Sequence, residues 1–248
     1  MLFRSTIRPH IRLKDGLTRT VVWPTVGLWH VQGAGGDIIL ALGPEPSLRW
    51  RAFSEQLMGV ADHFGASMML TLGALLADVP HSRPVQIIGT ATDQDLIERY
   101  SLQRSRYEGP TGIIGVIHDT CSTTALPSVA LWAAVPAYAS QVPSPKASLS
   151  LMRRACEIIG TPAPVASVMN LIDRYEEQVN SLVEDDEDLA AYVERLETMT
   201  DQGMSIDDEV DDGQLQFDFA EDTGDDAADA STLMDEVEQF LREQGEGK

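Results

Sequence analysis

Cysteine and long apolar runs are both scarce in this sequence. Its two cysteines, Cys121 and Cys156, are too few for the disulfide framework of a small secreted domain. No stretch reaches the roughly 18 apolar residues that a membrane-spanning helix needs. The opening MLFRSTIRPH is not followed by the apolar run of a signal peptide. These absences argue against secreted and membrane-spanning classes, and they predict a cytoplasmic protein with reduced thiols.

Recognisable metal and nucleotide motifs are also missing. The five histidines and two cysteines lack the spacing of a zinc site, and no phosphate loop with its lysine occurs. The segment HDTC places His118 and Cys121 three residues apart on an expected helix. A lone free cysteine is more often a small core residue than a nucleophile. We therefore predict no metal, no cofactor and no complete catalytic set.

Basic charge is scarce in the C-terminal part of the chain. Residues 1–172 hold 12 acidic and 14 basic side chains, whereas residues 173–248 hold 27 acidic and 4 basic ones. The net charge of −21 therefore belongs to the C-terminal arm. Nucleic acids and anionic membranes are polyanions that this field repels, so neither is expected as a partner. Basic or cationic partners are favoured.

Apolar strands alternate with amphipathic helices in the remainder. Strands are expected at HIRL and TRTVVW around a turn at 14–16, and at 26–32, 37–42, 67–73, 85–91 and 128–135. Helices are expected at 47–64, 93–100, 146–159, 165–182 and 185–199, with a further helix that starts at an N-cap near Thr111. The unbroken apolar run Ile38–Leu42 predicts a fully buried strand. This alternation predicts an α/β fold: a three-layer α/β/α domain with a mostly parallel sheet.

The pattern divides the chain into four segments. They are an α/β domain over 1–145, a helical subdomain over 146–199, a disordered acidic tether over 200–230 and a terminal amphipathic helix over 231–243. Leu233, Val237, Phe240 and Leu241 share one face of the terminal helix. A helix of that length is not stable alone, so we predict that these four side chains bind a partner.

Polar side chains gather in four loops at the ends of expected strands or helices. Ligands of open parallel sheets bind beyond the carboxyl ends of the strands, which makes these loops a candidate crevice. Its candidate residues are Glu45, Arg49, His81, Arg83, Glu108, Thr111 and Tyr138.

Each part of this crevice also has a structural interpretation. The turn 109–112 (GPTG) either presents helix N–H groups to an anion or is a simple capped turn. His81-Ser82-Arg83 either supplies a base, a hydroxyl and a cation or forms structural hydrogen bonds within a loop bounded by prolines. Glu45 is either a buried acid of a site or a carboxylate that stabilises the N-terminus of the helix that follows it.

The same loops carry a family resemblance. Five segments in order resemble the bacterial branch of the proteasome assembly chaperone family: GPEPSLRWRAF (43–53), TLGALLADVPHSRPVQIIGTAT (71–92), YEGPTGIIGVIHDTC (107–121), SVALWAAVPAYASQVPSPKASL (128–149) and VEDDEDLAAYVERLE (183–197). The resemblance implies a three-layer α/β/α domain similar to purine nucleoside phosphorylases, a helical C-terminal subdomain, and assembly into a homo-oligomer such as a trimer.

The beginning of the sequence departs from this family. Members usually carry an additional strand and a glycine-rich loop before the segment that resembles FRSTIRPH, and the sequence starts at that segment. Either the gene start is misplaced or the sheet lacks an element. A sheet without that element would leave unpaired strand edges.

Two functions from different classes follow. The leading hypothesis is a non-enzymatic assembly chaperone or scaffold, related through the family to proteasome assembly, which oligomerises and recruits a protein partner. The alternative is an enzyme or binding protein for a nucleoside-like or small anionic metabolite in the crevice. Some family members are labelled carboxylate-amine ligases, but the sequence has no recognisable nucleotide loop for that reaction.

Overall fold

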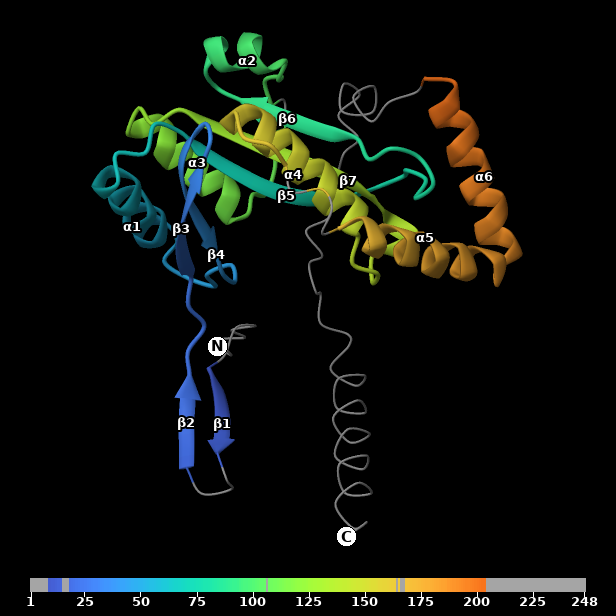
Figure 1. Ribbon diagram of the computed structural model, residues 1–248, viewed down its shortest axis with the longest axis horizontal. Coiled ribbons are helices and arrows are strands. Elements are labelled where there is room, and N and C mark those ends of the chain that lie inside the picture. Colours follow the sequence, from blue (N-terminus) through green and yellow to red (C-terminus); the bar gives the residue numbers. More distant parts are fainter. Residues whose placement is uncertain (1–8, 15–17, 106, 164, 166–167, 204–248) are drawn as a thin grey trace. The chain divides into compact units, whose positions relative to one another are not determined.

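A computed structural model of the 248-residue chain describes residues 9–14, 18–105, 107–163, 165 and 168–203 (Figure 1). The predicted terminal helix, with Leu233, Val237, Phe240 and Leu241, lies outside the described residues, as does nearly all of the predicted tether. Within the described part of the chain, no helix is both long and apolar enough to cross a membrane.

Two antiparallel hairpins begin the described chain. Strands β1 (His10–Lys14) and β2 (Thr18–Val22) form the first, and β3 (Gly27–Gly33) and β4 (Gly36–Leu42) form the second. Gly36 has a φ of 140°, a conformation that glycine adopts at low cost, so it suits the tight reversal between β3 and β4. The four strands confirm the sequence prediction.

The expected burial of β4 is wrong. Leu40 and Leu42 are 49% and 66% exposed. A continuous apolar run is typical of a strand in a covered parallel sheet. Among the described strands, β4 pairs only with β3, in a two-stranded sheet. The pattern therefore marks an apolar surface rather than a core strand.

The central sheet has three described strands in the order β5 (Met69–Ala77), β7 (Ser128–Pro136) and β6 (Ile87–Ala91). Strands β5 and β7 run parallel, whereas β6 is antiparallel to β7. The connection from β5 to β6 spans only residues 78–86 and holds no helix. A crossover to a parallel strand needs a dozen or more residues, so this short loop accounts for the reversed direction of β6.

Helices cover both faces of this sheet. On one face, α4 (Pro145–Ile159) and α2 (Gln94–Tyr100) pack against β7 and β6, and Figure 1 shows α4 crossing the strands. On the other face, α3 (Ile113–Thr123) contacts β7 and α1 (Trp50–His63) packs on α3. Each face has its own apolar cluster, built on Val129, Leu131 and Ile158 in one case and on Met58 and Ile117 in the other. The predicted three-layer α/β/α arrangement is confirmed.

Sequence signals explain both ends of α4. Ser144 caps α4 by accepting a hydrogen bond from the Ala147 amide at 3.1 Å, Pro145 occupies its first turn, and Gly160 ends it with a φ of 78°. For α3 the helix start near Thr111 is confirmed. The N-cap is Gly112, without a side-chain cap bond, and Thr111 lies one residue earlier.

Two acidic helices follow: α5 (Met169–Glu184) and α6 (Glu187–Asp201). Asp185 and Asp186 separate them, and Asp186 accepts hydrogen bonds from the amides of Asp188 and Leu189, as expected for an acidic helix start. Tyr175 and Val179 of α5 pack on Ala139, which belongs to the short 3-10 helix η1 (Ala137–Ala139) after β7. This contact holds α5 near the carboxyl end of the sheet.

Candidate functional site

A polar junction forms where the loop 78–86 leaves the carboxyl end of β5. Its centre is His81, which is only 5% exposed. The Nδ1 atom lies 2.8 Å from the Tyr138 hydroxyl of η1, and Nε2 lies 2.8 Å from Oδ1 of Asn180 in α5. The His81 amide also donates to the Tyr138 hydroxyl, at 2.8 Å. Both ring nitrogens are therefore used within the protein, and one imidazole ties three separate elements together.

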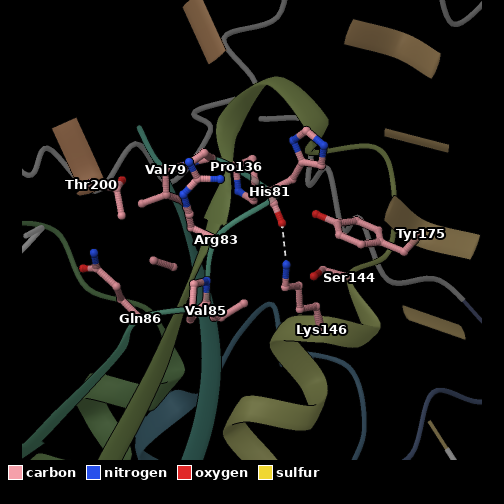
Figure 2. Close-up of a pocket in the computed structure, with 13 residues that line it drawn as sticks. Val79, His81, Arg83, Val85, Gln86, Pro136, Ser144, Lys146, Tyr175 and Thr200 are labelled. Atoms are coloured by element: carbon pink, nitrogen blue, oxygen red, sulfur yellow. Dashed lines mark hydrogen bonds between the residues drawn. The ribbon is translucent and has the colours of Figure 1, made fainter. Parts of the chain in front are cut away.

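Lys146 adds a fourth element to this junction. Figure 2 shows its side chain pointing from the start of α4 to the carbonyl oxygen of His81, to which it donates at 2.8 Å. The same ammonium group lies 2.6 Å from Oε1 of Glu176 in α5. A cation near a helix N-terminus is electrostatically disfavoured. The carbonyl oxygen and the carboxylate compensate that cost.

The rest of the loop is bonded to α6. Arg83 donates to both oxygens of Asp201, at 2.8 and 2.7 Å, and this bidentate hydrogen-bonded pair lowers the pKa of the Asp201 carboxyl. Ser82 donates to Glu197. Asp78 accepts a hydrogen bond from Tyr192 at 2.7 Å. Three side chains of one loop thus hold α6 beside the sheet.

Little space is left inside the junction. A pocket lies between the loop, the end of β7, α4 and α5, with His81, Arg83, Lys146 and Tyr175 among its lining residues (Figure 2). Its interior holds about one water molecule. Burial raises the pKa of Tyr138 to about 12. The geometry is that of a packed polar clamp.

Glu45 lies in a second place, at the start of α3. Its Oε1 accepts a hydrogen bond from the Ile113 amide at 2.7 Å. Of the two sequence interpretations of Glu45, the buried acid is wrong, because Glu45 is exposed. The second interpretation placed the carboxylate at the N-terminus of the helix that directly follows it, α1, whereas the structure places it at the N-terminus of α3. The N-terminus of α3 favours negative charge, and the chain's own carboxylate supplies it. The start of α3, for which an anion site was one of two interpretations, therefore already binds a carboxylate of the chain itself.

The seven predicted crevice residues thus fall in different places. His81, Arg83 and Tyr138 belong to the junction, whereas Glu45 lies beside Thr111 at the start of α3. Between described residues, no hydrogen bond or ion pair joins these two groups.

The other two residues of that set are exposed, as are Glu45 and Thr111. Arg49 caps α1 in a left-handed conformation with a φ of 61°, and Glu108 lies in the loop before α3. A ligand at any of these positions stays a prediction.

Sequence reasoning missed the junction partners Lys146, Asn180, Glu176 and Asp201. One signal was available, because Lys146 is the only lysine between Lys14 and the C-terminal Lys248, and it stands in the first turn of a helix. A cation in that position needs a nearby acceptor. The other three residues give no local signal, since they come close to the loop only through the fold.

In the HDTC segment, Cys121 belongs to the core, whereas Asp119 is exposed. Cys121 is fully buried, its thiol lies 3.7 Å from the sulfur of Met58, and burial raises its pKa. The ring of His118 contacts two neighbouring strands, with Nε2 2.8 Å from the Thr71 hydroxyl of β5 and Nδ1 2.9 Å from the Ser128 hydroxyl of β7. Burial lowers the pKa of His118. The core interpretation of Cys121 is confirmed.

A wider groove lies on the α4 side of the sheet. Its volume is about 630 Å³ including the open mouth, and small side chains line it, among them Ala74, Ala139 and Ala147. Within the described chain, no group of three or more histidine, cysteine, aspartate or glutamate side chains is arranged to hold a metal ion.

Several solved structures resemble this chain. A PAC2 family protein from Streptomyces avermitilis is 38% identical, with a TM-score of 0.67 over 75% of this chain and 79% of that one. A proteasome-assembly chaperone homologue from Mycobacterium tuberculosis is 40% identical, with a TM-score of 0.67 over 75% and 80% of the two chains. An archaeal proteasome activator from Pyrococcus furiosus shares the fold at 12% identity and a TM-score of 0.56, over 72% and 78%.

No curated protein matches this chain in sequence. A family model does match it and agrees with the solved structures. The model of the PAC2 family matches residues 1–183, which include the β-hairpins, the sheet, both helical layers and most of α5. With that match and the two bacterial structures at 38% and 40% identity, the chain belongs to the PAC2 family.

Proposed function

We propose that this protein is an assembly chaperone or scaffold that oligomerises and holds another protein through apolar surface, with proteasome subunits as the first partner to test. The observation that carries the proposal is the exposed apolar face of the β3–β4 hairpin.

This face is continuous across both strands. Trp29 pairs with Leu40 and Val31 with Ile38, and directly opposed residues of an antiparallel pair point to the same side. Trp29, Val31 and Leu40 are 50%, 47% and 49% exposed. Apolar patches of this kind mark protein interaction sites, and a tryptophan is the residue type most often found at their energetic centre.

Two of the similar solved structures support proteasome subunits as the class of partner. The structure from Mycobacterium tuberculosis that is 40% identical to this chain is described as a proteasome-assembly chaperone homologue, and the archaeal structures with the same fold include a proteasome activator. A shared fold alone does not transfer a partner. The proteasome is therefore the partner that the first experiment should use.

The experiment mixes the full chain with purified proteasome α and β subunits of Mycobacterium tuberculosis. Native mass spectrometry measures complexes, and peptidase activity follows the appearance of complete particles. We expect the chain to bind subunits and to change the rate of particle formation. Trp29→Ala with Leu40→Ala should weaken binding at least about 30-fold, the scale of a hot-spot loss of 2 kcal/mol.

Leu48→Ala is the matched control, because Leu48 is 67% exposed but lies outside the hairpin. It should bind like the unchanged chain. The proposal fails if the full chain binds no subunit and leaves the assembly rate unchanged, or if the control weakens binding as much as the paired substitution.

The terminal segment provides a second contact to test. Leu233, Val237, Phe240 and Leu241 would share a face of an amphipathic helix, which needs a surface in order to fold. A pull-down that compares the full chain with a chain lacking residues 231–248 measures this role. Retention of every partner by the shortened chain would remove the segment from the proposal.

A further inference from the structure

The β1–β2 hairpin stands without cover from the described part of its own chain. Every residue of 9–25 whose exposure the structure gives is exposed, including Ile11 at 49%, Leu13 at 63% and Trp23 at 66%. A lone two-stranded hairpin is at best marginally stable in water. Such apolar side chains on both strands need a surface to pack against.

The hairpin combines these apolar side chains with positive charge. Ile11 is paired with Val21, and Leu13 with Arg19, so apolar and cationic groups share one face. Arg12 lies on the opposite face, paired with Thr20. Residues 9–25 contain three cationic side chains, Arg12, Lys14 and Arg19, and a single acidic one, Asp15. The matching surface would be acidic and partly apolar.

The chain itself carries such a surface on α5 and α6. Residues 169–201 hold 11 acidic and 2 basic side chains. Described ion pairs occupy only three of these acids, at Glu176, Glu197 and Asp201. Three large apolar side chains of α5 are close to half exposed: Met169, Leu171 and Leu182.

We infer that the β1–β2 hairpin of one copy docks on α5 and α6 of a second copy. The contact is between copies because, within its own chain, the hairpin is exposed throughout the part described. Opposite charges steer and orient such a contact. The two surfaces differ, so the contact is head to tail and builds a ring or an open chain. This inference deepens the oligomer part of the proposed function by naming the interface.

The test measures the mass of the purified full chain by light scattering and native mass spectrometry, at low and high salt. We expect an oligomer that dissociates as salt rises. Charge reversal of the hairpin, Arg12→Glu with Arg19→Glu, should weaken association at least about tenfold, because it places like charges together. Reversal of α5 at Glu177→Lys with Glu184→Lys should have the same effect. Both acids are exposed, and described ion pairs use neither of them.

A charge swap makes the test specific. Each reversed chain should be monomeric alone, and an equal mixture of the two should form mixed oligomers, because every hairpin then has an oppositely charged α5 to bind. Arg51→Glu with Arg153→Glu reverses two exposed arginines on α1 and α4, and this control should assemble normally. Circular dichroism confirms that each variant is folded.

The inference is overturned if the unchanged chain is monomeric at low salt, if the hairpin reversal leaves the mass unchanged, or if the mixture fails to restore assembly. These measurements contain no other protein. Their failure therefore leaves the apolar face of β3–β4 and its proteasome test intact, and a failed proteasome test leaves this interface intact.

Discussion

The His81 junction makes the sharpest prediction about this structure. His81→Ala removes two ring hydrogen bonds, to Tyr138 and Asn180, from a site that is only 5% exposed. Each such bond contributes about 0.5–1.5 kcal/mol net. The space left by the ring adds about 1 kcal/mol. We expect a loss of about 2–4 kcal/mol in the free energy of unfolding.

Urea unfolding followed by tryptophan fluorescence measures this loss, because the change in midpoint at constant slope reports stability. Ser82→Ala is the matched control on the same loop, since its bond to Glu197 lies at the surface, and it should cost much less. Tyr138→Phe leaves the buried His81 amide without its acceptor and should cost about 1–3 kcal/mol. The double variant should cost less than the sum, because both changes remove the same contact.

The loss should also be local. His81 connects the sheet to α5, so amide hydrogen exchange over 169–184 should accelerate more in His81→Ala than exchange in β7. A cost below about 0.5 kcal/mol, equal to that of Ser82→Ala, would refute the clamp. Unchanged exchange in α5 would refute the connection.

Three further predictions concern the core. Because burial lowers the pKa of His118, the unfolded chain binds the proton more readily, so the stability contributed by the neutral ring is present above pH 6.5 and falls as the pH drops below it. His118→Gln should therefore flatten the fall in melting temperature between pH 7 and 5. An unchanged slope would contradict this prediction. Gly73→Ala would place a methyl 2.4 Å from the Trp132 ring, so it should lower the free energy of unfolding by about 1–3 kcal/mol and shift the tryptophan fluorescence. The control Gly59→Ala in α1 meets nothing within 4 Å and should be neutral or stabilising by up to about 1 kcal/mol. Equal urea midpoints for the two variants would contradict the Gly73–Trp132 contact. Cys121 should react with iodoacetamide far more slowly in the folded chain than in urea, and equal rates measured by mass spectrometry would show that it is not buried.

The elements of the fold were predictable because their signals are local. The period of Leu57, Val60 and Ala61 indicates a helix, and the positive-φ glycine at 65 ends it. Ser144-Pro145 starts α4 and Gly160 ends it through backbone preferences that act over a few residues. Predicted and observed boundaries accordingly differ by only a few residues.

The burial of β4 was not predictable in the same way. An apolar run such as Ile38–Leu42 is compatible with cover by a second layer of the same chain or by a partner, because the composition of a strand does not say what covers it. The structure shows Leu40 half exposed, because β4 pairs only with β3 among the described strands.

The sequence alone determined the order of strands and helices, the charge division at about residue 172, and the loops where polar side chains gather. Only the tertiary structure decided what those side chains do: His81 binds Asn180, 99 positions along the chain, and Glu45 caps α3 instead of α1. Periodicity and capping depend on neighbours within a few residues. Contacts across such separations depend on which elements pack together, and no local pattern encodes that.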